Sequence, residues 1–117
     1  MEKVAILAIH HVYAKAIYDG LKTFEVRKNR IHASKIYLYE TSPIKLITGM
    51  IEIGEPIKLP IEEIKSMYLK ETMLTPNLID LYAKDRPYLW LWPIKKADRI
   101  RPRPYTGPAI QSFTYIY

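Results

Sequence analysis

The chain has 117 residues, a formal net charge of +6 and no cysteine. This length suits one hydrophobic core, so we predict a single domain over residues 1–117, and the missing cysteine excludes disulfides, thiolate catalysis and cysteine-based zinc sites. No apolar run approaches the roughly 18 residues of a membrane helix and the N-terminus has no signal-peptide pattern, so we expect a cytoplasmic protein without a membrane partner.

The first segment predicts a strand followed by a short helix. Val4–Ile9 is apolar and of strand length. After it, Tyr13, Ala16 and Ile17 recur at helical spacing. Gly20 then stands where many helices end on a residue in the left-handed conformation.

Two histidines lie between this strand and this helix. His10 and His11 would sit at the end of the first strand, where a ring nitrogen could bond a base or a phosphate. The alternative is a helix-entry histidine exposed to water. None of the three histidines has metal-ligand spacing, so the sequence indicates neither a metal site nor a cofactor.

The next strand concentrates charge on one face. Its alternation gives an apolar face with Phe24 and Val26 and a polar face with Thr23, Glu25 and Arg27. Lys22, in the preceding turn, can reach the polar face. Charges on an inward face require partners or a wet cavity, because an unpaired buried charge loses several kcal/mol of hydration. The alternative is a surface salt bridge from Glu25 to Lys22, Arg27 or Lys28, worth about 0 to 1 kcal/mol and without function.

The pattern Gly20-x-Lys22-x-x-Glu25-x-Arg27, preceded by Val12-Tyr13-Ala14-x-x-Ile17, resembles the signature of ASCH domains, small β-barrels of the PUA-like superfamily. The usual form is G-x-K-x-x-T-x-R, so Glu25 stands where most members have Thr. The resemblance implies an α+β fold: a mixed β-barrel with a helix after the first strand and a helical insertion before the last strands.

The resemblance also implies nucleotide chemistry. ASCH and PUA-like domains are mostly associated with RNA or modified nucleosides, and one small bacterial branch hydrolyses N4-acylated cytidines. In that branch a Thr attacks the amide carbonyl, a Lys activates the Thr, and a Glu handles the proton sent to the leaving nitrogen. Lys22 matches the Lys, Glu25 occupies the Thr position and Glu71 is the candidate for the Glu.

Two further strands are expected in the middle of the chain. In Lys35–Glu40, alternation places Ile36, Leu38 and Glu40 opposite Tyr37 and Tyr39. Leu46–Ile57 reads as one long strand, in which Gly49 and Gly54 permit a bulge or a sharp bend.

The helical insertion has two start signals. Pro60 suits the first turn of a helix whose buried stripe holds Ile61, Ile64 and Tyr68, and the pair Glu62 and Glu63 fits a helix N-terminus better than a catalytic dyad. Thr75 is the predicted N-cap of the second helix, and Pro76 is its first helical residue. The second helix leads into Leu78, Leu81 and Tyr82, which recur at helical spacing, and should end near Arg86.

Pro87–Ile94 predicts a central strand, because both of its faces are apolar. Trp90 and Trp92 fit core packing better than the alternative, a platform on which a base stacks. Alternation in Gln111–Tyr117 suggests a last strand.

The segment Lys95–Arg103 is strongly basic, with five cations against Asp98. Its prolines keep it extended, so Arg101 and Arg103 could follow a phosphate backbone. The alternative is a mobile, solvated linker. The overall charge and a pI near 9.5 favour a polyanionic partner, and the abundance of Ile, Lys and Pro suggests a thermophilic source.

The sequence therefore predicts an RNA-binding or modified-nucleoside-binding domain with a charged pocket at the barrel mouth. The candidate binding residues are His10, Lys22, Glu25, Arg27, Lys28, Arg101 and Arg103. One alternative is a small amidohydrolase acting on N4-acylated cytidine through Lys22, Glu25 and Glu71. A second alternative is a protein-interaction adaptor. The sequence does not indicate an oligomeric state.

Overall fold

The computed structural model describes residues 3–116 and contains strands and helices in mixed order. In chain order these are β1 (Val4–Ile9), α1 (His11–Tyr18), β2 (Phe24–Arg27), β3 (Lys35–Glu40), β4 (Leu46–Ile53), β5 (Ile57–Pro60), α2 (Ile61–Met67), α3 (Leu69–Thr72), α4 (Pro76–Ala83), β6 (Tyr88–Arg103) and β7 (Phe113–Tyr115).

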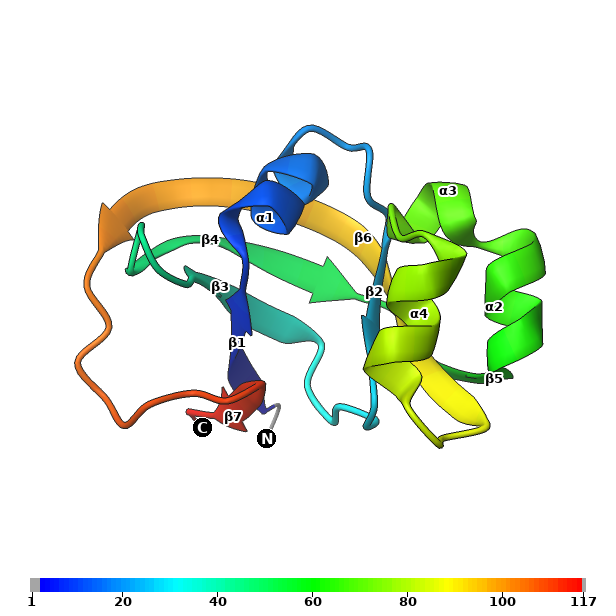
Figure 1. Ribbon diagram of the computed structural model, residues 1–117. Coiled ribbons are helices and arrows are strands. Elements are labelled where there is room, and N and C mark those ends of the chain that lie inside the picture. Colours follow the sequence, from blue (N-terminus) through cyan, green and yellow to red (C-terminus); the bar gives the residue numbers. More distant parts are fainter. Residues whose placement is uncertain (1–2, 117) are drawn as a thin grey trace.

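Within residues 3–116, the strands form one seven-stranded sheet in the order β2-β6-β4-β3-β1-β7, with β5 also paired to β6. β1 and β3 are parallel and the other pairs are antiparallel. The sheet curls into a half-barrel, with α1 over the curl and α2, α3 and α4 gathered beside β2 and β5 (Figure 1). The expected α+β fold is confirmed: a mixed, barrel-like sheet, a helix after β1 and helices before the last strands.

A bulge near Gly49 helps to bend the sheet. The register of β4 against β6 shifts between Ile47 and Gly49, as the sequence predicted. A Cβ atom at Gly49 would lie 2.6 Å from the carbonyl oxygen of Asp98 and would also strike the hydroxyl of Tyr18. Glycine is therefore required here by close packing of α1 and β6 on β4.

Strand β6 separates two hydrophobic clusters. Leu89 and Leu91 face a cluster built with α2 and α4, whereas Trp92 faces the cluster inside the curl. Trp92 is fully buried and Trp90 is half-buried against the same inner cluster. The prediction of a central strand with two apolar faces is confirmed, and Trp92 is a core residue.

The predicted long strand Leu46–Ile57 is wrong, because the chain leaves the sheet after Ile53. β4 pairs with the second half of β6, and β5 pairs with its first half. The intervening residues redirect the chain: the amide of Gly54 donates to the carbonyl of Pro93, and Pro56 has no amide to offer a ladder. Pro60 ends β5 and occupies the N-cap position of α2 without a side-chain hydrogen bond, and the helix begins at Ile61.

The second helix of the insertion exposes two of the three apolar residues that mark it in the sequence. Thr75 caps α4 as expected, its hydroxyl accepting from the amide of Leu78. Leu78 and Leu81 are 43% and 71% exposed, however, and the buried positions are Ile79 and Ala83. Residues 78–83 are apolar at nearly every position, so the sequence pattern fits more than one choice of buried helix face. The helix also ends at Ala83, earlier than expected.

The basic segment is not a linker. Lys95–Arg103 continues β6, and Arg103 pairs with Ile47. β7 confirms a last strand over Phe113–Tyr115, antiparallel to β1, while the predicted end of that strand at Tyr117 lies outside the described residues. No helix in the described part of the chain is long and apolar enough to span a membrane.

Candidate functional site

The turn between α1 and β2 fixes the position of the charged motif. Gly20 has a φ of +78°, the left-handed conformation expected at this helix end. The amides of Leu21 and Lys22 both donate to the carbonyl of Ala16. The amide of Thr23 then donates to the carbonyl of Glu71 in α3 at 2.9 Å. The turn is therefore held from both α1 and the helical insertion.

Glu25 lies between two cations and is buried. Its Oε2 accepts from Arg27 Nε at 3.0 Å and from Arg27 Nη2 at 2.6 Å, and its Oε1 lies 3.4 Å from Lys22 Nζ. Glu25 is 5% exposed and Lys22 2%. The alternative of a surface salt bridge is therefore wrong: the ions are paired, but inside the protein.

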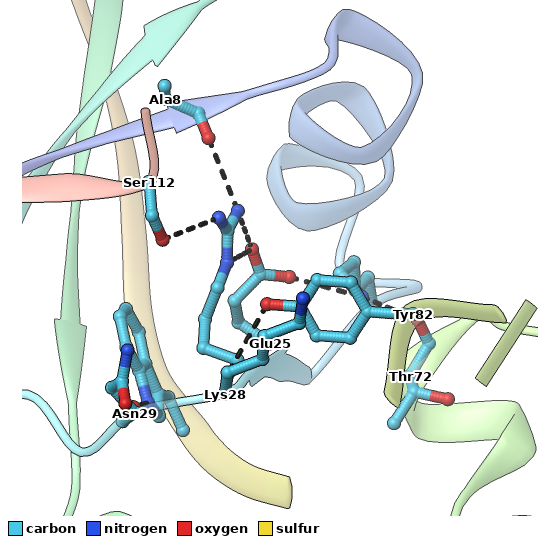
Figure 2. A network of polar contacts seen from close by, with 10 residues as sticks. Ala8, Glu25, Lys28, Asn29, Thr72, Tyr82 and Ser112 are labelled. Atoms are coloured by element: carbon cyan, nitrogen blue, oxygen red, sulfur yellow. Dashed lines mark hydrogen bonds and ion pairs between the residues drawn. The ribbon is translucent and has the colours of Figure 1, made fainter. Parts of the chain in front are cut away.

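The guanidinium of Arg27 also reaches across the open side of the sheet. Nη2 donates to the carbonyl oxygen of Ala8 in β1, and Nη1 donates to the hydroxyl of Ser112 before β7, both at 3.2 Å. Figure 2 shows these bonds converging from Ala8 and Ser112 on the group beside Glu25. One side chain of β2 thus joins the two ends of the strand order.

Lys22 has partners from three elements. Its Nζ donates to the backbone carbonyl of Thr72 at the end of α3, pairs with Glu25 and lies 5.2 Å from the ring centroid of Tyr13 in α1. The ammonium is held by a carbonyl, a carboxylate and an aromatic face, which all favour a positive charge.

Burial and ion pairing shift the pKa values of Glu25 and Lys22 in opposite directions. Burial alone would raise the pKa of Glu25, but the charges of Arg27 and Lys22 outweigh it and hold that pKa below its ordinary value. Burial lowers the pKa of Lys22, and attraction to Glu25 only partly offsets this. Glu25 is therefore ionised at neutral pH, and Lys22 releases its proton more readily than a surface lysine does.

A cavity of about 320 Å³ opens beside these charges. It is near the lower end of the range for small-molecule sites. Three groups of side chains line it: the charged residues Lys22, Glu25 and Arg27, the rings of His10, Tyr13 and Tyr82, and apolar residues that include Ile9, Val26, Leu74 and Leu78. The cavity combines a charged patch with apolar and aromatic walls.

Four of the predicted site residues line this cavity: His10, Lys22, Glu25 and Arg27. His10 is exposed and also caps α1, its Nδ1 accepting from the amide of Val12 at 3.3 Å. His10 is therefore an exposed residue at the start of a helix, as the alternative stated, and it also lines the cavity.

The other predicted residues lie outside the cavity in the described chain. Lys28 has its Nζ 5.0 Å from the ring centroid of Tyr82, which lines the cavity. Glu71 accepts the amide of Thr23 through its backbone, so its contact with the motif is not through its carboxylate. Arg101 and Arg103 lie at the far end of β6, on the side of the molecule away from α4 (Figure 1).

Sequence reasoning missed the part of the cavity that the helical insertion supplies. Leu74, Leu78 and Tyr82 line the cavity together with residues of β1, α1 and β2. The sequence places Leu78 and Tyr82 on a helix and indicates no role in binding for either of them. Nothing in the local pattern indicates that this helix docks against the motif strand. Among residues 3–116, no three side chains that could ligate a metal lie together.

The model of the ASCH domain family matches residues 7–102. Two solved structures from Zymomonas mobilis have closely similar folds. The ASCH protein itself is 23% identical, covers 98% of this chain and 88% of its own, and has a TM-score of 0.86. The S128A mutant of that protein, ZmASCH, is 23% identical, covers 99% and 89%, and has a TM-score of 0.88. No curated protein matches the chain. The chain belongs to the ASCH domain family.

Proposed function

We propose that this protein binds RNA or a modified nucleoside and that the cavity beside Glu25 holds the base. ASCH domains are generally linked to RNA binding. The observation that carries the proposal is a buried, ionised carboxylate flanked by two cations at the edge of a cavity with aromatic walls. A nucleobase needs polar groups and aromatic rings around it, because its edges form hydrogen bonds and its faces stack.

The charged residues supply both donors and acceptors for a base. An ionised Glu25 only accepts, so it suits an exocyclic amine such as that of cytosine or guanine. The guanidinium of Arg27 uses four of its N–H groups within the described residues and keeps one on Nη1, which suits a base carbonyl or a phosphate. Lys22 adds a further donor beside Glu25.

The rings that line the cavity are placed to contact the faces of a base. Tyr13 comes from α1 and Tyr82 from α4, and both line the cavity. Base–aromatic stacking contributes about 1 to 3 kcal/mol per base. Packing holds both rings, because Tyr13 lies against the cluster inside the curl and Tyr82 against the cluster of α2 and α4. The hydroxyl of Tyr82 also accepts from the amide of Lys28 at 3.2 Å. The walls are therefore formed before a ligand arrives.

Calorimetric titration with cytidine, guanosine, uridine and N4-acetylcytidine tests this proposal. We expect nucleosides with an exocyclic amine to bind more tightly than uridine, because uridine presents a carbonyl oxygen to the ionised Glu25 in place of a hydrogen-bond donor. The difference should be about 1 to 3 kcal/mol, the cost of an unsatisfied buried polar group. Equal affinity for uridine and cytidine would contradict the assigned role of Glu25.

Hydrolysis of an N4-acylated cytidine is the second candidate, and the lowered pKa of Lys22 favours it. Position 25 offers no hydroxyl, and no Ser or Thr of the described residues lines the cavity. Water would therefore be the nucleophile: its oxygen attacks the acyl carbonyl, a neutral Lys22 takes its proton, and the C–N bond breaks as that proton passes to the leaving amine.

Cytidine release from N4-acetylcytidine tests hydrolysis, with Lys22→Ala and Glu71→Ala as variants. Turnover that disappears in Lys22→Ala supports catalysis at the cavity. If neither the wild type nor the variants release cytidine, binding remains the proposed function. If Lys22→Ala releases cytidine at the wild-type rate, Lys22 is not the general base.

A further inference from the structure

A second concave surface lies next to the cavity. It has a volume of about 360 Å³ and is lined by cationic and aromatic side chains of four segments: Lys28, Lys58, Arg86, Tyr88 and Trp90. We refer to it as the basic groove. Lys28 connects the two sites, because its amide donates to the hydroxyl of Tyr82 and its Nζ lies over the ring of Tyr82, which lines the cavity.

The cations of the basic groove have no carboxylate partners. In the described part of the chain, no acidic residue lines the groove, and no carboxylate lies within ion-pair distance of Lys28, Lys58 or Arg86. Lys58 instead lies over the ring of Tyr88 at 5.1 Å, and Arg86 contacts the carbonyl of Lys28. Three positive charges are thus free to attract a polyanion.

The sheet register aligns the groove with the charged motif. Arg27 pairs with Trp90, and Trp90 pairs with Lys58, so these three side chains project from the same face of three adjacent strands. Adjacent strands lie roughly 4.8 Å apart. The side chains of Arg27, Trp90 and Lys58 therefore form a row that runs from the cavity to the basic groove. Beyond it, Tyr88 is 46% exposed.

We propose that the basic groove binds the nucleotides that flank the base held in the cavity, so that the ligand is single-stranded RNA rather than a free nucleoside. This inference rests on the proposed function and names its substrate class. Lys28, Lys58 and Arg86 contact phosphates, and Tyr88 stacks a flanking base. Alternating aromatic rings and cations along one groove is the chemistry that single strands require.

Fluorescence anisotropy with a short, labelled single-stranded RNA tests the groove. The double variant Lys58→Gln/Arg86→Gln should bind this RNA more weakly and reduce the slope of log affinity against log salt by about 1.4, since each phosphate contact on a single strand contributes roughly 0.7. Its control, Lys35→Gln/Lys70→Gln, removes the same charge from exposed lysines outside the groove and should keep the wild-type slope.

A second pair of variants tests stacking without changing charge. Tyr88→Ala should weaken RNA binding by roughly fivefold to a hundredfold, whereas Tyr88→Phe keeps the ring and should bind like the wild type. Thermal melts of all variants report folding, which should be unchanged because the substituted side chains are exposed.

The free nucleoside separates this inference from the proposed function. The groove variants should bind the tightest nucleoside of the calorimetric panel as the wild type does. If the groove variants also keep wild-type RNA affinity and salt slope, the groove inference is wrong and the cavity proposal stands. If no nucleoside binds to the wild type but RNA binding depends on the groove, the cavity proposal fails instead.

Discussion

The guanidinium of Arg27 donates to the backbone carbonyl of Ala8 at 3.2 Å and so joins β2 to β1, two strands that do not pair. The half-barrel is closed on this side by a side chain rather than by a backbone ladder. Because the same guanidinium pairs with Glu25 at the cavity, one residue serves both the fold and the candidate site.

We expect Arg27→Met to destabilise the protein by about 3 to 5 kcal/mol, because it removes the main partner of a buried carboxylate. Ser112→Ala removes only one bond of the guanidinium and should cost about 1 kcal/mol. Urea denaturation measures both. Equal costs would show that the ion pair inside the protein contributes little to stability.

The acid sensitivity of the fold should depend on Glu25. Its folded pKa lies below its unfolded value of about 4.3, so its stabilising contribution is complete above that value and is lost as pH falls through the folded pKa. Urea midpoints between neutral and acid pH should therefore fall more steeply for the wild type than for Glu25→Gln. Parallel curves would contradict the pairing of Glu25 with Arg27 and Lys22.

Gly49→Ala should destabilise the protein by about 1 to 3 kcal/mol, because its Cβ meets the carbonyl of Asp98 and the hydroxyl of Tyr18. A double-mutant cycle checks the cause. The cost should shrink in a Tyr18→Phe background, which removes the hydroxyl. Gly20→Ala is the control: no atom lies within 4 Å of its added Cβ, its cost arises from the positive φ, and Tyr18→Phe should not change it.

The sequence predicts well what depends on local alternation. The polar face of β2 is a period-two pattern, so the convergence of Glu25 and Arg27, and the reach of Lys22 from the turn, follow from the motif alone. The bulge at Gly49 and the cap at Thr75 are local in the same sense.

Contacts between distant segments could not be predicted from the same patterns. Ser112 is 85 residues from Arg27 in the chain, and no local pattern indicates that they meet. Leu78 and Tyr82 line the cavity only because α4 docks beside β2, and the nearly continuous apolar run of α4 hides which face docks. The break after Ile53 was missed for a related reason, since β6 is long enough to receive both β4 and β5.

The most direct test of base binding in the cavity fills it without altering its charges. Leu78 lines the cavity and is partly exposed, whereas Leu81, on the same helix, is 71% exposed and lies outside it. Calorimetry with the tightest nucleoside of the panel should show affinity reduced at least about tenfold, or 1.4 kcal/mol, in Leu78→Trp and unchanged in Leu81→Trp, with both melting like the wild type. Wild-type affinity in Leu78→Trp, or no nucleoside binding to the wild type at all, would contradict the account.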